Sequence, residues 1–201
     1  MGGESVSGTV SIARLLHVDG LRAVAYLNAM AIRDIITAPD PRLRQISEPI
    51  DKVDDGIRAL MDDMLETMYA APGIGLAAIQ IGVPKRVIVM DLARDGEEPQ
   101  PMYFANPEIL TTAGDMAVYE EGCLSVPQFY EDVERPATCR VRFIDYQNEL
   151  RELDCEGMLA TCIQHEMDHL QGILFVDHLS RIKRSMVLKK LAKAKKLAAT
   201  A

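Results

Sequence analysis

Two histidines lie four residues apart in the run His165-Glu166-Met167-Asp168-His169. On a helix, side chains at this spacing share one face, so the two imidazoles can bind one divalent ion. Glu166 lies beside them and can reach a water molecule on the ion rather than the ion itself. The flanking residues indicate a central helix rather than a solvated one, because they are apolar: Ile163, Met167 and Leu170. The pattern therefore predicts a hydrolase that uses a metal ion, with Glu166 as its acid and base.

A catalytic metal site usually has a third protein ligand and one open position. His178 is the only histidine after the motif, and Cys123 lies upstream in the run Glu121-Gly122-Cys123-Leu124-Ser125. A thiolate is a strong ligand for soft or borderline ions, although a free cysteine is more often a small, buried, apolar residue. The spacing alone leaves both candidates open.

A third segment, Gly73-Ile74-Gly75-Leu76-Ala77-Ala78-Ile79-Gln80, has two glycines at alternate positions. The glycines permit another backbone to lie close alongside, and Gln80 offers an amide donor. The same residues are also typical of an ordinary helix end followed by a core strand. By itself, the segment is a weak signal.

Together and in this order, the three segments resemble the motifs of peptide deformylases, a family that removes the N-formyl group from nascent bacterial proteins. The family's motifs are a Gly-Ile-Gly-Leu-Ala-Ala segment ending in Gln, a Glu-Gly-Cys-Leu-Ser segment and a Gln-His-Glu-x-Asp-His segment. They match Gly73–Gln80, Glu121–Ser125 and Gln164–His169 of this chain. The resemblance runs from about Met30 to Lys196. It implies a metal-dependent hydrolase that acts on the N-terminal formyl-methionine of nascent polypeptides and releases formate.

The resemblance also implies a role for each matching position. Water and three residues would coordinate the ion: Cys123, His165 and His169. Glu166 would be the general base and then the general acid. The groups facing the developing oxyanion would be the side chain of Gln80 and the backbone N–H of Leu124.

The substrate-binding residues follow from the same resemblance. Ile74 and Gly75 match the edge that pairs with the substrate backbone, which is an instance of β-strand addition. The positions that match the pocket for the methionine side chain include Met158, Thr161 and Cys162. Tyr130 stands where some relatives carry an arginine near the substrate, so we leave it out of the predicted site.

The ligand set bears on the choice of metal. A thiolate donates more charge than a third imidazole would, so the predicted set suits Fe²⁺ as well as Zn²⁺. The family is known as an iron enzyme that is sensitive to oxidation. The resemblance therefore implies one divalent ion, Fe²⁺ in the native protein, with Zn²⁺, Ni²⁺ or Co²⁺ as alternatives in purified protein.

Three other interpretations remain open at this point. A zinc metallopeptidase of the HExxH type would share the helix and Glu166 but would not need Cys123. A cysteine hydrolase would use Cys123 as nucleophile with a histidine as base, and would stay active without metal. A binding module with a structural metal would need a fourth protein ligand, and none is evident near these motifs.

The elements that position these residues predict an α+β fold, because strands and helices do not alternate regularly. We expect antiparallel or mixed sheets packed around the central helix that carries the two histidines, with a C-terminal helix. A stripe of apolar residues, many of them methionines that fill the core, predicts a helix over residues 54–69. The other expected elements are strands at 86–92, 102–104, 138–146 and 149–155, the last two joined by a turn at Gln147-Asn148, and helices at 157–171 and 179–197.

The chain of 201 residues is expected to hold one catalytic domain, residues 30–178. Residues 1–29 are small, polar and weakly patterned, so we expect an N-terminal extension outside the core, with Met30 as the natural start. Residues 179–201 are expected to form a basic helix. The four cysteines form no CxxC pair, and no signal-peptide pattern or apolar run of about 20 residues is present. We therefore expect a cytoplasmic monomer with reduced thiols and no membrane contact.

The net charge of −8 conceals a strong asymmetry along the chain. The segment from Arg181 to the end carries eight lysines and arginines and no acid, whereas the preceding residues carry 14 basic and 30 acidic side chains. The body should repel nucleic acid and the tail could attract it. The tail could be no more than a solvated helix face. The resemblance implies in addition that it docks on ribosomal RNA near the exit tunnel.

Overall fold

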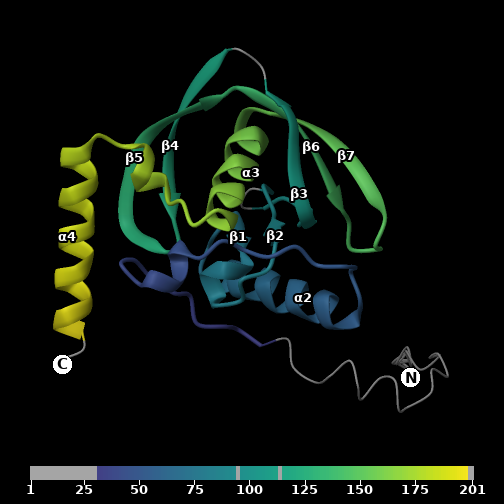
Figure 1. Cartoon of the computed structure of the whole chain (residues 1–201), viewed down its shortest axis with the longest axis horizontal. Coiled ribbons are helices and arrows are strands. Elements are labelled where there is room, and N and C mark those ends of the chain that lie inside the picture. The colour runs from purple at the N-terminus through teal and green to yellow at the C-terminus, as the bar shows by residue number, and fades with distance from the viewer. Residues whose placement is uncertain (1–30, 94–95, 113–114, 199–201) are drawn as a thin grey trace, which may run out of the picture. The chain divides into compact units, whose positions relative to one another are not determined.

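The structure is a computed structural model that describes residues 31–93, 96–112 and 115–198 (Figure 1). The expected N-terminal extension, residues 1–29, lies outside these residues. The described part contains three α-helices and seven strands, and every pair of these strands is antiparallel, which confirms the predicted α+β class. The elements are η1 (Pro41–Arg44), α2 (Asp55–Ala70), β1 (Gly75–Ala77), η2 (Ala78–Ile81), β2 (Val87–Met90), β3 (Met102–Thr112), β4 (Met116–Cys123), β5 (Val126–Pro136), β6 (Thr138–Ile144), β7 (Leu150–Glu156), α3 (Gly157–Leu170), η3 (Phe175–His178) and α4 (Arg181–Ala198).

The strands form two separate sheets around α3. Five of them pair in the order β1-β2-β3-β6-β7, and β4 and β5 form a two-stranded ribbon. Figure 1 shows α3 between this ribbon and strands β3, β6 and β7. The helix contacts four strands of the larger sheet as well as β5, so both sheets position residues against it.

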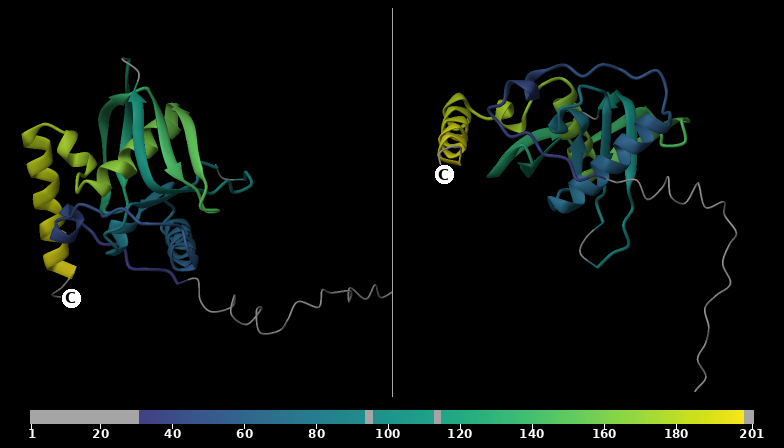
Figure 2. Two further views of the ribbon diagram at one scale, coloured as in Figure 1. Left: turned by 45° about the vertical axis from the view of Figure 1, so that its right-hand side comes forward. Right: turned by 90° about the horizontal axis from the view of Figure 1, so that it is seen from below.

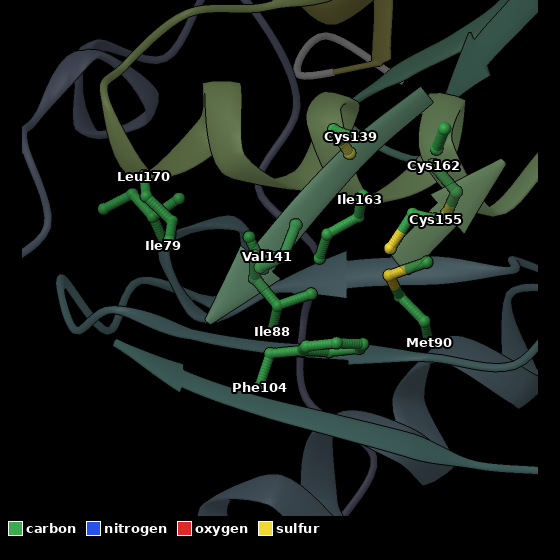
Figure 3. Close-up of a cluster of buried hydrophobic side chains, with 12 residues drawn as sticks. Ile79, Ile88, Met90, Phe104, Cys139, Val141, Cys155, Cys162, Ile163 and Leu170 are labelled. Carbon is green, nitrogen blue, oxygen red and sulfur yellow. The ribbon is translucent and has the colours of Figure 1, made fainter. Parts of the chain in front are cut away.

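Strand β2 is buried on both faces, which explains its uninterrupted apolar sequence. Ile88 and Met90 face one core cluster, which includes Ile163 and Leu170 of α3. Figure 3 shows these side chains gathered with Phe104 between sheet and helix. The alternate residues of β2 pack instead against the methionines of α2 in a second cluster. The larger sheet is thus held between two helices.

Helix α2 forms where the sequence predicts it, to within one residue at each end. Asp54 precedes the helix, and its side chain accepts a hydrogen bond from the Ile57 N–H, which satisfies one donor of the first turn. Met61, Met64 and Met68 are fully buried, which confirms that these methionines fill the core.

The sequence patterns do not predict β4 and β5, and they predict only the first three residues of β3. The ribbon carries charged residues along both strands, because much of its surface faces solvent. Strand β3 continues through Pro107, which lacks an N–H donor; a register shift between Ala105 and Glu108 and a positive φ at Asn106 accommodate it.

Helix α4 begins at Arg181, two residues later than expected, because η3 ends at His178. Val187 and Leu191 bury their side chains in a third core cluster with residues of η1, β5 and η3. In both views of Figure 2, α4 lies apart from the five-stranded sheet. No helix among the described residues is long and apolar enough to cross a membrane.

Candidate metal centre

Three side chains converge where the β4–β5 turn meets α3. Cys123 ends β4 and pairs with Val126, so that only two residues form the turn. His165 and His169 come from successive turns of α3, and their ring centroids are 5.0 Å apart. The possible ligand atoms of the three residues lie within 4.8 Å of one another, and Cys123 Sγ is 3.2 Å from His169 Nε2. Among the described residues, this is the only group of three such side chains that could hold a metal ion.

The structure separates the two candidates for the third ligand. His178 does not join the group: its Nε2 lies 2.7 Å from Asp168 Oδ2, in an exposed contact outside the cluster. Cys123, from the upstream segment, lies beside His169 instead.

His165 is fixed in orientation by a carboxylate. Its Nδ1 lies 2.8 Å from Glu121 Oε2, which leaves Nε2 as the nitrogen available to a metal ion. Burial tends to raise the pKa of Glu121, but hydrogen bonds from His165 and Arg135 lower it to about 2. Burial alone would lower the pKa of His165, yet its bonds to Cys123 and Glu121 raise it well above the usual value. The carboxylate of Glu121 beside the ring favours positive charge at this position, whether a proton or a metal ion on Nε2 supplies it.

His169 lies in a different environment on the same helix. It is fully buried, and burial holds its pKa well below the ordinary value, so the ring is neutral. A neutral imidazole is the form that binds metal. His169 thus has the protonation state of a ligand, whereas a metal ion on His165 would have to displace the proton that its surroundings favour.

Glu166 is a buried carboxyl group with an unused acceptor. Its side chain is 4 % exposed, and Oε2 has no hydrogen-bond partner among the described residues. Burial raises the pKa of Glu166 to about 7. A carboxyl group with this pKa can take up and return a proton near neutral pH.

Gln80 lies next to the thiol of Cys123, and both the oxygen and the nitrogen of its side-chain amide make hydrogen bonds. Its Oε1 accepts from the Ala77 N–H at 2.8 Å, and its Nε2 donates to Ser125 Oγ at 3.1 Å. The same Nε2 is 3.6 Å from Cys123 Sγ. The amide donor predicted from the sequence therefore lies beside Cys123, one of the predicted metal ligands, and Gln80 is itself buried.

A cleft of about 520 Å³ opens beside Cys123, His165 and Glu166, whereas Gln80 and His169 are not among its lining residues. The residues predicted to bind substrate all line it, from two different elements: Ile74 and Gly75 at β1, and Met158, Thr161 and Cys162 on α3. The cleft is also lined by Leu124, Cys123, His165 and Glu166. Strand β1 is a terminal strand of its sheet, so one of its edges does not pair with another strand of that sheet.

The structure adds residues that the sequence patterns do not identify. Tyr130 lines the cleft, although the sequence analysis leaves it out of the site. Its ring packs against Gly122, where a Cβ atom would overlap it, and its side chain is 66 % exposed. Arg135 is buried behind the ligands and pairs with Glu121 and Asp168. Neither residue lies in one of the three motifs.

Comparison with known proteins identifies one family. Residues 32–185 match the model of the family described as polypeptide deformylase. A peptide deformylase of Phenylobacterium zucineum is 68% identical over 169 residues, which cover 84% of this chain and 100% of the relative. A second, from Afipia carboxidovorans, is 62% identical over 170 residues, or 85% of this chain and 99% of the relative.

Solved structures agree in fold with this chain. The crystal structure of peptide deformylase from Ehrlichia chaffeensis superposes with a TM-score of 0.80 at 38% identity, over 84% of this chain and 99% of that one. A crystal structure from the same organism, in complex with actinonin, has a TM-score of 0.78 at 41% identity and covers 82% of this chain and 98% of that chain.

Proposed function

The chain belongs to the polypeptide deformylase family, and on this premise we propose that Cys123, His165 and His169 hold the divalent ion on which the family's hydrolysis depends. The enzyme removes the N-formyl group from the formyl-methionine of nascent polypeptides and releases formate. The convergence of one thiol and two imidazoles at the end of a cleft, beside a buried carboxyl group, is the observation that carries the proposed site.

The residues present fit a divalent ion. Their donor atoms are close enough to share one ion, the Glu121 carboxylate beside His165 favours positive charge, and Glu166 Oε2 is buried without a partner among the described residues. When bound, the ion supplies a Lewis acid that makes water a stronger nucleophile at neutral pH. We propose Fe²⁺ as the native ion, with Zn²⁺, Ni²⁺ or Co²⁺ as substitutes, because a thiolate with two imidazoles suits all of these ions.

Glu166 provides the proton transfers in this proposal. It takes a proton from the attacking water and then gives it to the departing amine. Its pKa of about 7 allows both steps near neutral pH. Glu166 lies on the same helix as the two proposed histidine ligands and lines the cleft that substrate would enter.

Gln80 and the backbone N–H of Leu124 stabilise the oxygen on which negative charge develops. Leu124 directly follows Cys123 and lines the cleft, and the Gln80 amide is held next to the thiol. The Gln80 amide is held by hydrogen bonds to Ala77 and Ser125 before substrate arrives, so it needs little reorganisation as charge develops.

The substrate backbone pairs with β1 in this proposal. Ile74 and Gly75 line the cleft at the terminal strand of the sheet, where an extended peptide can add as a further strand. The methionine side chain then enters the part of the cleft lined by Met158, Thr161 and Cys162.

A formate-release assay with control of the metal tests the proposed function. Anaerobically purified protein should release formate from a formyl-methionyl peptide, lose this activity in 1,10-phenanthroline, and recover it with Fe²⁺. Full activity in metal-free buffer would favour a cysteine hydrolase. Cleavage of unformylated peptides, with no formate released, would favour a metallopeptidase.

Gly75 supports a prediction about the general base. A Cβ atom built at this position overlaps Glu166 Oε1 and lies 2.9 Å from its Cδ. We expect Gly75→Ala to displace the carboxylate and to lower kcat roughly 10²-fold, as errors of about 1 Å in catalytic groups do. Bound metal, measured by elemental analysis, should stay at the wild-type level because no ligand is touched.

The control is Gly56→Ala in α2, where the nearest atom to the added Cβ is Asp54 Oδ1 at 3.4 Å. This variant should keep the wild-type kcat. A Gly75→Ala enzyme with unchanged kcat would contradict the close placement of Glu166.

We further propose that α4 docks on the ribosome near the exit tunnel and that the enzyme acts there as a cytoplasmic monomer. Eight basic residues and no acid follow Ser180, while the rest of the chain is acidic. Val187 and Leu191 anchor the helix to the core, whereas Lys189 and Lys193 are exposed. Phosphate groups of RNA are the partner that this charge pattern suits.

Charge reversal tests this docking without removing the buried side chains of α4. A Lys189→Glu/Lys193→Glu variant should co-sediment with ribosomes roughly tenfold more weakly than wild type, and the wild-type interaction should weaken as salt rises. The control, Lys52→Glu/Lys85→Glu, changes the charge equally at exposed positions outside α4. Equal losses in both variants, or binding that salt does not affect, would contradict docking through α4.

A further inference from the structure

Arg135, on β5, is the only lysine or arginine that is buried among the described residues, with 5 % of its surface exposed. Its guanidinium group makes ion pairs on two sides. Nε and Nη2 donate to Glu121 Oε1 and Oε2 at 2.5 and 3.0 Å. Nη1 donates to Asp168 Oδ2 at 2.9 Å. One side chain thus joins strand β4 to helix α3.

Both acidic partners lie next to proposed metal ligands. Glu121 precedes Cys123 by two residues and also binds Nδ1 of His165. Asp168 directly precedes His169. Arg135 is therefore one side chain removed from His165, and its partners lie within two residues of the other two proposed ligands, yet it does not line the cleft.

We propose that Arg135 is a positioning residue that holds the β4–β5 ribbon against α3 and so sets the distance between Cys123 and the two histidines. The proposal rests on the function proposed above, because it assumes that these three residues bind one ion.

The topology shows why such a link is needed. Cys123 belongs to the two-stranded ribbon, and no strand of the ribbon pairs with the five-stranded sheet in the described residues. A two-stranded ribbon has little stability of its own. The separation of Cys123 from α3 must therefore be maintained by packing and by polar links across the interface, and Arg135 supplies one of them, to Asp168. Its second ion pair holds Glu121, which itself contacts His165 of α3.

The charges at this interface depend on the same side chain. Glu121 is as buried as Arg135, so its carboxylate needs a positive partner. A lysine could neutralise one carboxylate, but a single ammonium group cannot reproduce the planar fork that bonds Glu121 twice and Asp168 once. Arg135→Lys therefore keeps the positive charge and removes the planar group that bonds both carboxylates. The variant separates the effect of hydrogen-bond geometry from the effect of charge.

Metal affinity is the direct measurement of positioning. We expect Arg135→Lys to bind Zn²⁺ about 10- to 100-fold more weakly than wild type in competition with a chromophoric chelator, as loss of a partner of a metal ligand typically does. Its Co²⁺-loaded form should show a shifted visible absorption spectrum, because the ligand geometry changes. A purely structural role would lower the melting temperature and leave both of these readouts unchanged.

Two further variants complete the test. Arg33→Lys is a matched control, because Arg33 also bonds a carboxylate on another segment, Asp63, away from the site. It should keep the wild-type metal affinity. Asp168→Asn weakens the link of Arg135 to α3 and leaves its bonds to Glu121 in place, although it also changes the contact with His178. This variant replaces Arg135→Lys if that protein does not fold, and it should also bind Zn²⁺ more weakly.

The outcomes separate this inference from the proposed function. Wild-type protein that binds no metal would overturn the proposed ligands themselves. Wild-type protein that binds metal, together with an Arg135→Lys or Asp168→Asn variant of equal affinity and an unchanged Co²⁺ spectrum, would overturn only the role of Arg135.

Discussion

The Glu166→Gln variant should keep its metal ion and lose formate release by a factor of about 10² to 10⁴ in kcat. Glutamine has nearly the same shape as glutamate, but it cannot take a proton from water near neutral pH. Glu166 is not among the three residues whose donor atoms converge, so the metal content should not change. Formate release and elemental analysis on the same preparation measure both effects.

The stability of this variant provides an internal control. Because burial raises the pKa of Glu166, the charged carboxylate opposes folding at pH values above its usual range, and the protonated form does not. Removing the charge at pH 8 should therefore leave the melting temperature of the apoprotein equal or higher. Metal loss or a large fall in stability would show that Glu166 has a structural role, and wild-type kcat would exclude it as the base.

Cys123→Ala should cost the enzyme both its metal and its activity. The change removes the only sulfur ligand of the proposed set and leaves two imidazoles. Catalytic metal sites usually have three protein ligands, so the remaining set is one ligand short. We expect metal content after dialysis to fall to a small fraction of wild type and formate release to fall with it. Elemental analysis and Zn²⁺ competition with a chromophoric chelator measure the loss.

Cys139→Ala is the matched control for this substitution. Cys139 is also a free thiol, but it lies in the core on β6 and outside the ligand group. It should keep its metal and its activity. A Cys123→Ala protein with full metal occupancy and activity would instead favour a peptidase of the HExxH type, which does not need the thiol.

The residues that the sequence identifies are those whose role depends on local spacing. The histidines stand four apart on one helix, and the stripe from Ile57 to Met68 has the helical period, so both helices are predictable. The role of Arg135 depends on partners that are 14 and 33 residues away in the chain. No local pattern distinguishes it from an exposed arginine.

The ribbon was unpredictable for a related physical reason. Its strands expose much of their surface, so they lack the continuous apolar run that identifies β2. The position of Tyr130 at the cleft depends on this ribbon, since its ring packs against Gly122 of the neighbouring strand. A residue on an unpredicted pair of strands could not be assigned to the site from sequence alone.

The terminal position of β1 has a consequence for the range of proteins that the enzyme can process. Hydrogen bonds to an added strand use main-chain groups, which are the same in every polypeptide. Side-chain recognition is then confined to the methionine, the residue that all formylated chains share. If substrate binds β1 as proposed, one cleft can accept many different polypeptides, and variation in the residues that follow methionine should change the rate of formate release only slightly.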